Sequence, residues 1–320
     1  MSAFLVPTSG VLKVPAALRP DFAVAVDLAK AEKAPSTRKA YGTDFRLFAV
    51  YCDARGVGSL PALPETVAAY LASEAQSAKP STISRRLAAI RYAHKLAGLD
   101  APTDQETVKA TMRGIRRTLG GSKNKKTPAV APQVVRMVAH MPAGLIGLRD
   151  RAVLLLGFAG AFRRSELVAL DVADLAENQT GLVVNVRGSK TDQERQGEII
   201  AIARGRVTCP VEALRVWLHA ARIEAGPIFR PIDRGGTVRD LRLTCRSVAN
   251  IVKAGAERAG LDSTSYSGHS LRSGFLTSAA GNGASIFKMM DVSRHKSVDT
   301  LRGYVRDAEL FKDHAGAGLL

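Results

Sequence analysis

The sequence has few of the residues on which several other protein classes depend. Only 3 of its 320 residues are cysteine, and Cys52, Cys209 and Cys245 form no C-x-x-C pair. This spacing argues against a disulfide framework or a cysteine-based zinc site. The longest apolar run, residues 152–162, has about half of the roughly 20 residues that a membrane-spanning helix requires. The first residues lack the basic region and apolar core of a signal peptide, so we expect a soluble, cytoplasmic protein in a reducing compartment.

Aromatic and acidic side chains are also scarce. Aromatic residues make up 5% of a chain that is 46% hydrophobic, which is typical of a well-buried, mainly helical protein long enough for two domains. Lysine and arginine total 46 against 29 aspartate and glutamate residues, a formal net charge of +17. A basic excess of this size usually accompanies a polyanionic partner, most often nucleic acid. The alternative is a basic surface that contacts only solvent.

The N-terminal part of the chain has the spacing of a small helical module. Residues 1–34 show little periodicity and are expected to form a poorly ordered arm, whereas residues 35–120 contain four apolar stripes at helical spacing. Proline and capping residues predict where these helices start. The predicted starting residues and caps are Ser36, Pro64, Ser81 as an N-cap after Pro80, and a capping box of Thr103 and Glu106.

The last of these four segments has a basic face, and a basic linker of residues 121–130 follows it. The first 130 residues carry 20 basic and 10 acidic side chains, a net charge of +10, which leaves +7 for the other 190. Such a module can hold one side of a DNA duplex through phosphate contacts. The candidate DNA-binding residues are Lys109, Arg113, Arg116, Arg117, Lys123, Lys125 and Lys126.

A larger second domain is expected over residues 131–320. Residues 152–158 are apolar on all sides, as in a helix buried in a core, and Arg163 and Arg164 follow after residues 159–162. These arginines need partners, because an unpaired buried charge is strongly destabilising. Alternating segments predict two strands, a polar connection joins them, and helical patterns follow. The strands are expected at 182–186 and 198–202, the connection at 187–197, and the helices at 210–224 and 247–260.

The segment from residue 268 to residue 304 gathers side chains suited to phosphate chemistry. His269 and Arg272 are three residues apart, so both project from one face if they lie in the first turn of a helix. His295 lies nine residues before Tyr304, and this pair adds an imidazole and a phenol that can donate, accept or attack. One arginine, two histidines and a tyrosine together indicate an anionic substrate.

These residues, taken in order, resemble the tyrosine recombinase (phage integrase) family. The resemblance rests on Arg163-x-x-Glu166-Leu167, Lys190 in the polar connection, His269-x-Leu271-Arg272, His295 and Tyr304. It implies a mainly α fold with a small antiparallel β-sheet. A helical, SAM-like core-binding domain over 35–120 would precede a mixed α/β catalytic domain over 131–320, which ends in a tail helix.

The resemblance also implies a site-specific DNA recombinase that works through a 3′-phosphotyrosine intermediate without metal, ATP or another cofactor. Arg163 and Arg272 would present planar guanidinium groups to the phosphoryl oxygens. Tyr304 would be the nucleophile, and Lys190 would protonate the departing 5′ oxygen. Arg187 and Arg195 are alternatives to Lys190, and Arg164 is an alternative to Arg163.

The remaining roles are assigned by the same resemblance. His269 would take the tyrosine proton or bind a phosphoryl oxygen, and His295 would hold a nonbridging oxygen in the transition state. Glu166 would orient the site. The alternative for each charged residue is a structural ion pair, for each histidine a satisfied core position, and for Tyr304 a place in the core.

Two dipeptides depart from the pattern of the family. Many relatives have Gly-Leu before the first arginine and Leu-Gly before the second histidine, where this chain has Ala161-Phe162 and Ser293-Arg294. Neither departure removes a reactive group. The alternative functions are a type IB topoisomerase-like enzyme that relaxes DNA, and a non-catalytic DNA-binding regulator with the same fold.

The expected partners are double-stranded DNA and three further copies of the chain, with no membrane. In relatives the segment after the tyrosine packs into a neighbouring protomer, and Leu319 and Leu320 of the tail 308–320 suit this role in a tetramer. The alternative is that the tail folds onto its own domain. Only about 34 residues precede the first predicted helix, which favours simple Cre-like or Xer-like sites and leaves accessory DNA-bending proteins open.

Overall fold

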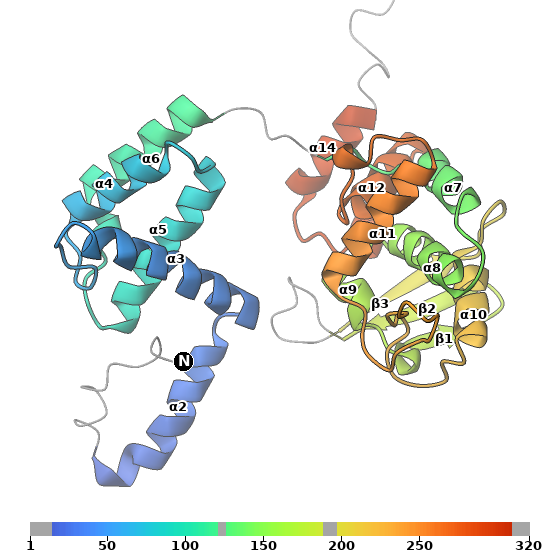
Figure 1. Ribbon diagram of the computed structural model, residues 1–320, viewed down its shortest axis with the longest axis horizontal. Helices are drawn as coiled ribbons and strands as arrows, with labels where there is room; N and C mark the ends of the chain where they lie inside the picture. Colours follow the sequence, from blue (N-terminus) through green and yellow to red (C-terminus); the bar gives the residue numbers. More distant parts are fainter. Residues whose placement is uncertain (1–14, 121–125, 188–196, 309–320) are drawn as a thin grey trace, which may run out of the picture. The chain divides into compact units, whose positions relative to one another are not determined.

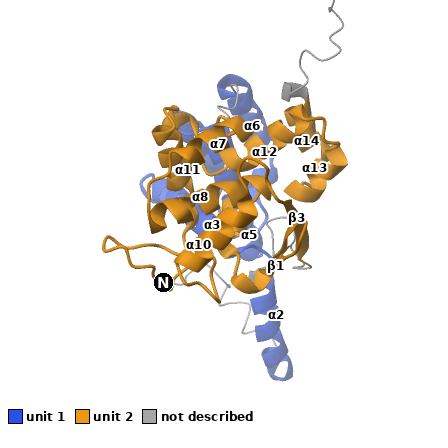
Figure 2. Cartoon of the chain, turned by 90° about the vertical axis from the view of Figure 1, so that its right-hand side faces the viewer, with its two compact units in different colours: residues 1–123 blue, residues 124–320 orange. Residues whose placement is uncertain are grey.

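The structure is a computed structural model that describes residues 15–120, 126–187 and 197–308 (Figure 1). The chain divides into two compact units, residues 1–123 and residues 124–320 (Figure 2). The fold is mainly helical, and the described residues include one small antiparallel sheet. No helix of the described residues is long and apolar enough to cross a membrane.

Four helices form the core of the first unit: α3 (Pro35–Asp53), α4 (Pro64–Glu74), α5 (Pro80–Leu96) and α6 (Glu106–Leu119). Proline occupies the first turn of α3, α4 and α5, where a missing backbone N–H costs nothing. The predicted stripe of α3 is confirmed, because Phe45, Phe48 and Cys52 are buried. They pack with apolar residues of the other three helices into one cluster.

The prediction of a poorly ordered arm over residues 1–34 is wrong for residues 16–31, which are helical. Helix α2 (Arg19–Ala31) follows a short 3₁₀ turn, η1 (Ala16–Leu18). Pro20 and Asp21 in its first turn are ordinary helix-start signals. The apolar side chains Val24 and Leu28 are exposed, so this helix has no buried stripe that the sequence pattern could reveal.

The predicted caps of α5 and α6 are also wrong. Ser81 lies inside the first turn of α5, and the N-cap is Lys79, which is extended as expected for a residue before proline. Thr103 is buried in a separate 3₁₀ turn, η2 (Pro102–Asp104). Helix α6 begins three residues after Thr103, with Gln105 as its N-cap.

The described part of the second unit starts at Lys126. Residues 126–130, assigned to the linker by sequence, belong to this unit: Ala129 is buried and its N–H donates to Ser270 O at 2.8 Å. The predicted linker was therefore too long at its C-terminal end. The helices before the sheet are α7 (Ala131–Ala139), α8 (Leu145–Ala159) and α9 (Arg164–Ala169). After the sheet come α10 (Pro210–Ala220), α11 (Cys245–Arg258), α12 (Ser270–Gly281), α13 (Ile286–Ser293) and α14 (Val298–Ala308).

The sheet has the order β1-β2-β3, and both pairings are antiparallel. Its strands are β1 (Leu175–Glu177), β2 (Gly181–Val186) and β3 (Glu198–Ala203). The two predicted strands correspond to β2 and β3, and buried Val184 faces buried Ile200 across them. The sequence pattern missed β1, which has three residues and no buried side chain.

Helix α8 lies at the centre of the second unit and is buried along residues 152–156, as predicted. A β-carbon at Gly157 would lie 3.0 Å from Leu271 and 3.1 Å from Leu167. The absence of a side chain there lets α9 and the start of α12 approach α8 closely. Because Arg163 immediately precedes α9 and Arg272 lies in the first turn of α12, this packing places both arginines at one end of α8.

Helices α12, α13 and α14 pack around a smaller apolar cluster of Leu276, Ala280, Met289 and Leu301. Tyr304 of α14 packs against this cluster and is half-buried. The cluster therefore positions the phenol relative to α12. The tail 309–320, including Leu319 and Leu320, lies outside the described residues.

A candidate active site of arginines and histidines

Arg163 and Glu166 form a tight unit at the start of α9. Arg163 is the N-cap residue, and its backbone N–H donates to Glu166 Oε2 at 2.8 Å. Its guanidinium Nη1 donates to Glu166 Oε1 at 2.6 Å. A glutamate at the third position of a helix commonly accepts from the N-cap backbone in this way. The local motif therefore fixes Arg163 through its main chain and its side chain together.

Arg272 is buried in the first turn of α12, with 1% of its surface exposed. Its Nη1 donates to the carbonyl oxygen of Ala161 at 2.7 Å. Burial, with the positive charges of Arg163 and Arg294, lowers the pKa of Arg272 to about 9. The group is still protonated at neutral pH. A buried, protonated guanidinium among like charges is stabilised by binding an anion.

His269 is the residue just before α12, and its side chain is accessible to solvent. Desolvation by the surrounding protein, followed by the charges of Arg272, Arg164 and Arg163, lowers the pKa of this imidazole. His269 is therefore neutral at pH 7 and able to accept a proton. Arg164 packs against Gly268, where a β-carbon would lie 2.1 Å from Arg164 Cδ.

His295 is oriented by Ser293, which is fully buried. The Ser293 hydroxyl donates to Met289 O at 2.5 Å, so its oxygen can accept from His295 Nδ1, which lies 2.8 Å away. This pairing assigns the proton of the neutral ring to Nδ1. Arg272 Nη2 lies 3.3 Å from both ring nitrogens of His295. Burial, then the charges of Arg272 and Arg163, lowers the pKa of His295 to about 4.

Tyr304 lies on α14, and the charge of an ionised phenol there would raise the pKa of Arg272. Lys190 and Arg195 lie outside the described residues, on the connection between β2 and β3. Arg187, an alternative to Lys190, forms ion pairs with Asp171 and with Asp174, the latter at 2.8 Å. These partners hold Arg187 at the start of the connection between β2 and β3.

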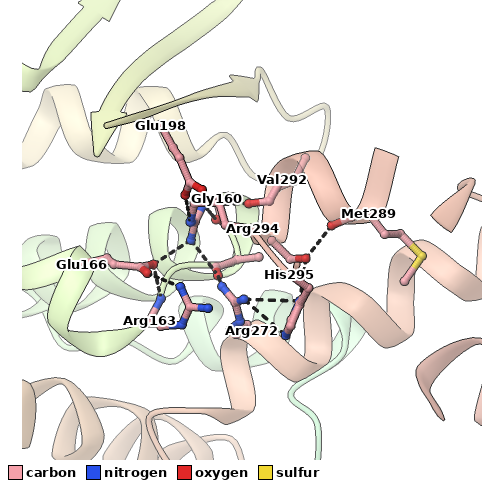
Figure 3. A network of polar contacts seen from close by, with 11 residues as sticks. Gly160, Arg163, Glu166, Glu198, Arg272, Met289, Val292, Arg294 and His295 are labelled. Carbon is pink, nitrogen blue, oxygen red and sulfur yellow. Dashed lines mark hydrogen bonds and ion pairs between the residues drawn. The ribbon is translucent and has the colours of Figure 1, made fainter. Parts of the chain in front are cut away.

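A continuous polar network links Arg163, Glu166, Arg272 and His295 through Arg294 and the Ala161 carbonyl oxygen (Figure 3). Sequence reasoning missed two charged members of the network, Arg294 and Glu198; Arg294 donates to Glu166 Oε2 at 2.7 Å. Burial opposes the ionised carboxylate, but the charges of Arg294 and Arg163 hold the pKa of Glu166 below its usual value. The signal for Arg294 was the departure from glycine next to the second histidine.

The basic face of α6 is exposed as predicted, over Lys109, Arg113, Arg116 and Arg117. Arg113 forms an ion pair with Glu106, and Arg116 donates to Ser84 Oγ at 3.3 Å. Lys126 belongs to the second unit, where its Nζ donates to Thr264 O at 2.6 Å. Lys123 and Lys125 lie outside the described residues.

Comparison with known proteins gives the class of this fold and site. Residues 130–310 match the model of the phage integrase family. The chain is 42% identical over 290 residues to the integrase/recombinase xerD homolog of Selenomonas ruminantium, covering 88% of this chain and 85% of that protein. The chain belongs to the phage integrase family.

Two solved structures have the same fold. A XerH site-specific recombinase bound to palindromic difH substrate, in a post-cleavage complex, superposes with a TM-score of 0.61 and 16% identity, covering 80% of this chain and 72% of that one. A lambda integrase dimer bound to a COC′ core site gives a TM-score of 0.61 and 17% identity, covering 88% of this chain and 92% of that one. Within its family, the chain is a tyrosine-type site-specific DNA recombinase.

Proposed function

We propose that this recombinase cuts and rejoins double-stranded DNA at a specific site through a 3′-phosphotyrosine intermediate, without metal or ATP. The observation that carries the proposal is the burial of protonated Arg272 in one polar network with Arg163 and His295. Buried cationic donors of this kind stabilise the charge that develops on a phosphoryl group under attack. The proposal assigns both arginines to the nonbridging oxygens.

The chemical step is a transfer of the phosphoryl group from a 5′ oxygen to Tyr304. The phenol oxygen attacks the scissile phosphorus, a phosphorus–tyrosine bond forms, and the bond to the 5′ oxygen breaks. The phenol proton passes to His269, which is neutral at pH 7 because of its lowered pKa. Lys190 supplies a proton to the departing oxygen. The reverse sequence rejoins the strand, because the phosphotyrosine retains the energy of the original phosphodiester.

The proposed partners follow from charge and from the relatives. The exposed basic face of α6 is suited to the DNA backbone, and the named structural relatives were solved on DNA sites. We propose that four copies act on two duplexes and exchange strands through a Holliday junction. The tail 308–320 would join neighbouring copies.

The proposal is tested with nicked duplexes that carry candidate sites, incubated with the protein and a chelator. A covalent protein–DNA band on a denaturing gel is expected for the unaltered protein and is expected to be lost in Tyr304→Phe, because only the phenol oxygen is removed. Tyr92→Phe is a matched control, since the Tyr92 hydroxyl is buried and has no hydrogen-bond partner among the described residues. This control should form the adduct normally.

Three results would contradict the proposal. Specific binding without any adduct would indicate a DNA-binding regulator that does not cut. An adduct that persists in Tyr304→Phe would show that another residue is the nucleophile. Relaxation of plasmids by a monomer, with no preference for a site, would instead indicate an enzyme similar to type IB topoisomerases.

A further inference from the structure

Arg294 occupies a backbone position that favours glycine. It follows α13 with φ of 58° and ψ of 40°, in the left-handed region that side chains with a β-carbon rarely adopt. Its side chain is nevertheless 2% exposed. A long charged side chain is seldom buried without partners, so both the backbone and the side chain must be stabilised by specific contacts.

The guanidinium of Arg294 is held by a cage of acceptors. Nη1 donates to Val292 O at 2.7 Å and to Gly160 O at 3.2 Å. Nη2 donates to Glu166 Oε2 at 2.7 Å and to Ala161 O at 3.2 Å. The ring of Phe162 lies 5.2 Å from the guanidinium carbon.

Two of these acceptors are shared with the proposed phosphate-binding arginines. Glu166 accepts from Arg294 on Oε2 and from the Arg163 side chain on Oε1. The carbonyl oxygen of Ala161 accepts from both Arg294 and Arg272. Arg294 is therefore linked to Arg163 through the Glu166 carboxylate, and to Arg272 through the Ala161 carbonyl oxygen (Figure 3).

The Glu166 carboxylate is shared by two arginines, and this affects how much of the charge of Arg163 it neutralises. Glu166 is buried between Arg163 and Arg294, and Glu198 Oε2 approaches Arg294 Nε at 3.7 Å. Arg294 shares the carboxylate, so Glu166 does not cancel the charge of Arg163 one for one. The shared carboxylate orients Arg163 and leaves part of its charge to act on a bound anion.

We propose that Arg294 is a positioning residue, which holds Glu166 and the Ala161 carbonyl so that Arg163 and Arg272 face the same phosphate. This inference rests on the proposed function and deepens it. Arg294 itself is enclosed by protein acceptors and does not touch the DNA. Its contribution is to the rate of the chemical step and not to DNA affinity.

The test compares Arg294→Gly with Arg222→Gly in single-turnover cleavage of a nicked duplex. Arg222 is a matched control, because it also has a left-handed backbone, with φ of 51°, and its side chain is exposed outside the site. We expect Arg294→Gly to slow adduct formation about 100-fold, the usual effect of misplacing groups by about 1 Å. The Kd for DNA should change less than about 3-fold, because no proposed phosphate contact is removed.

A second pair of variants separates positioning from simple charge balance. Arg294→Gly leaves Glu166 short of a partner and is expected to lower the Tm, whereas Arg294→Gly combined with Glu166→Gln removes that buried charge. We expect the double variant to regain stability while it cleaves at least about 10-fold more slowly than Glu166→Gln alone, because the Ala161 contact is still missing. Arg294→Lys, which has one ammonium instead of a planar fork, should recover only part of the rate.

The possible outcomes are distinct. No adduct from the unaltered protein would reject the proposed function and the role that rests on it. An adduct from the unaltered protein, with Arg294→Gly as fast as Arg222→Gly, would reject the role of Arg294 and leave the function standing. A double variant as fast as Glu166→Gln alone would show that Arg294 only balances a buried charge.

Discussion

At the scale of single residues, His295 is held neutral and in one tautomer. Its Nδ1 proton is directed to Ser293, so Nε2 lacks a proton in the DNA-free protein. To donate to a phosphoryl oxygen from Nε2, the ring must gain a proton. Burial, followed by the neighbouring cations, opposes that protonation and lowers the pKa to about 4. A bound phosphodiester adds a negative charge that offsets them and raises the pKa.

DNA binding is therefore expected to take up protons. Between about pH 4 and the raised pKa of the complex, bound His295 carries more protons than free His295, so affinity should rise as the pH falls through this window. Calorimetric titrations at pH 6 in buffers with different ionisation enthalpies measure the uptake. His295→Gln should reduce it, and the exposed His219→Gln should not.

His269 has a lowered pKa as well and contributes to the same uptake. A His269→Gln variant allows the two contributions to be separated. Equal proton uptake in His295→Gln and the unaltered protein would contradict the tautomer and the role assigned to His295.

At the scale of elements, the site depends on how closely α12 approaches the segment before α7. Gly274 lies on α12, two residues after Arg272, and a β-carbon there would lie 1.8 Å from Ala129 O. Ala129 O is a backbone atom, and the N–H of the same residue donates to the carbonyl oxygen of Ser270 on α12. The helix cannot keep its place if this glycine gains a side chain.

We expect Gly274→Ala to destabilise the second unit by about 3 kcal/mol or more, at the upper end of the cost of overpacking. Displacement of α12 would also move Arg272, so adduct formation should fall with stability. Gly281→Ala on the same helix is the control, because nothing lies within 4 Å of its β-carbon. Chemical denaturation measures both, and a Gly274→Ala variant as stable as Gly281→Ala would contradict the packing.

At the scale of the whole molecule, charge is expected to govern DNA affinity. The net charge of +17 and the exposed basic face of α6 predict binding that weakens steeply with salt. Each phosphate contact contributes about 0.9 to the slope of log K against log salt concentration. The change in this slope between a variant and the unaltered protein therefore gives the number of phosphate contacts that the variant has lost.

Replacement of Lys109 and Arg117 by glutamine should reduce that slope by about 1.8, for two lost phosphate contacts. Arg215→Gln, on α10 of the other unit, is the control, because Arg215 is exposed and already paired with Glu212 at 2.8 Å. Fluorescence anisotropy over a range of salt concentrations measures both slopes. An unchanged slope in the Lys109 and Arg117 variant would exclude α6 from the DNA interface.

Much of the fold and of the candidate site was predictable because the relevant signals are local. Apolar spacing predicted α3, α8 and the strands β2 and β3. The motifs placed Arg163, His269, Arg272, His295 and Tyr304, of which the structure joins Arg163, Arg272 and His295 in one network. The roles of these residues remain predictions, as does that of Lys190.

The rest could not be predicted because no strong local pattern marks it. Helix α2 has no buried stripe, and β1 is too short to show an alternation. The caps of α5 and α6 depended on where a proline and a separate 3₁₀ turn fall. In each case the competing local signals were too weak to choose between neighbouring residues.

The sequence by itself determined which reactive side chains this protein carries and in what order, because residue types and their spacing are read directly from the chain. Only the tertiary structure decided what holds those groups in place. Arg294 lies 133 positions from Ala161 and 128 from Glu166 along the chain, yet it contacts both. Left-handed backbone at Ala161 and Arg294, with φ of 44° and 58°, is accepted because the surrounding network stabilises it. Contacts between distant segments form only when the chain folds, so no stretch of sequence shows them.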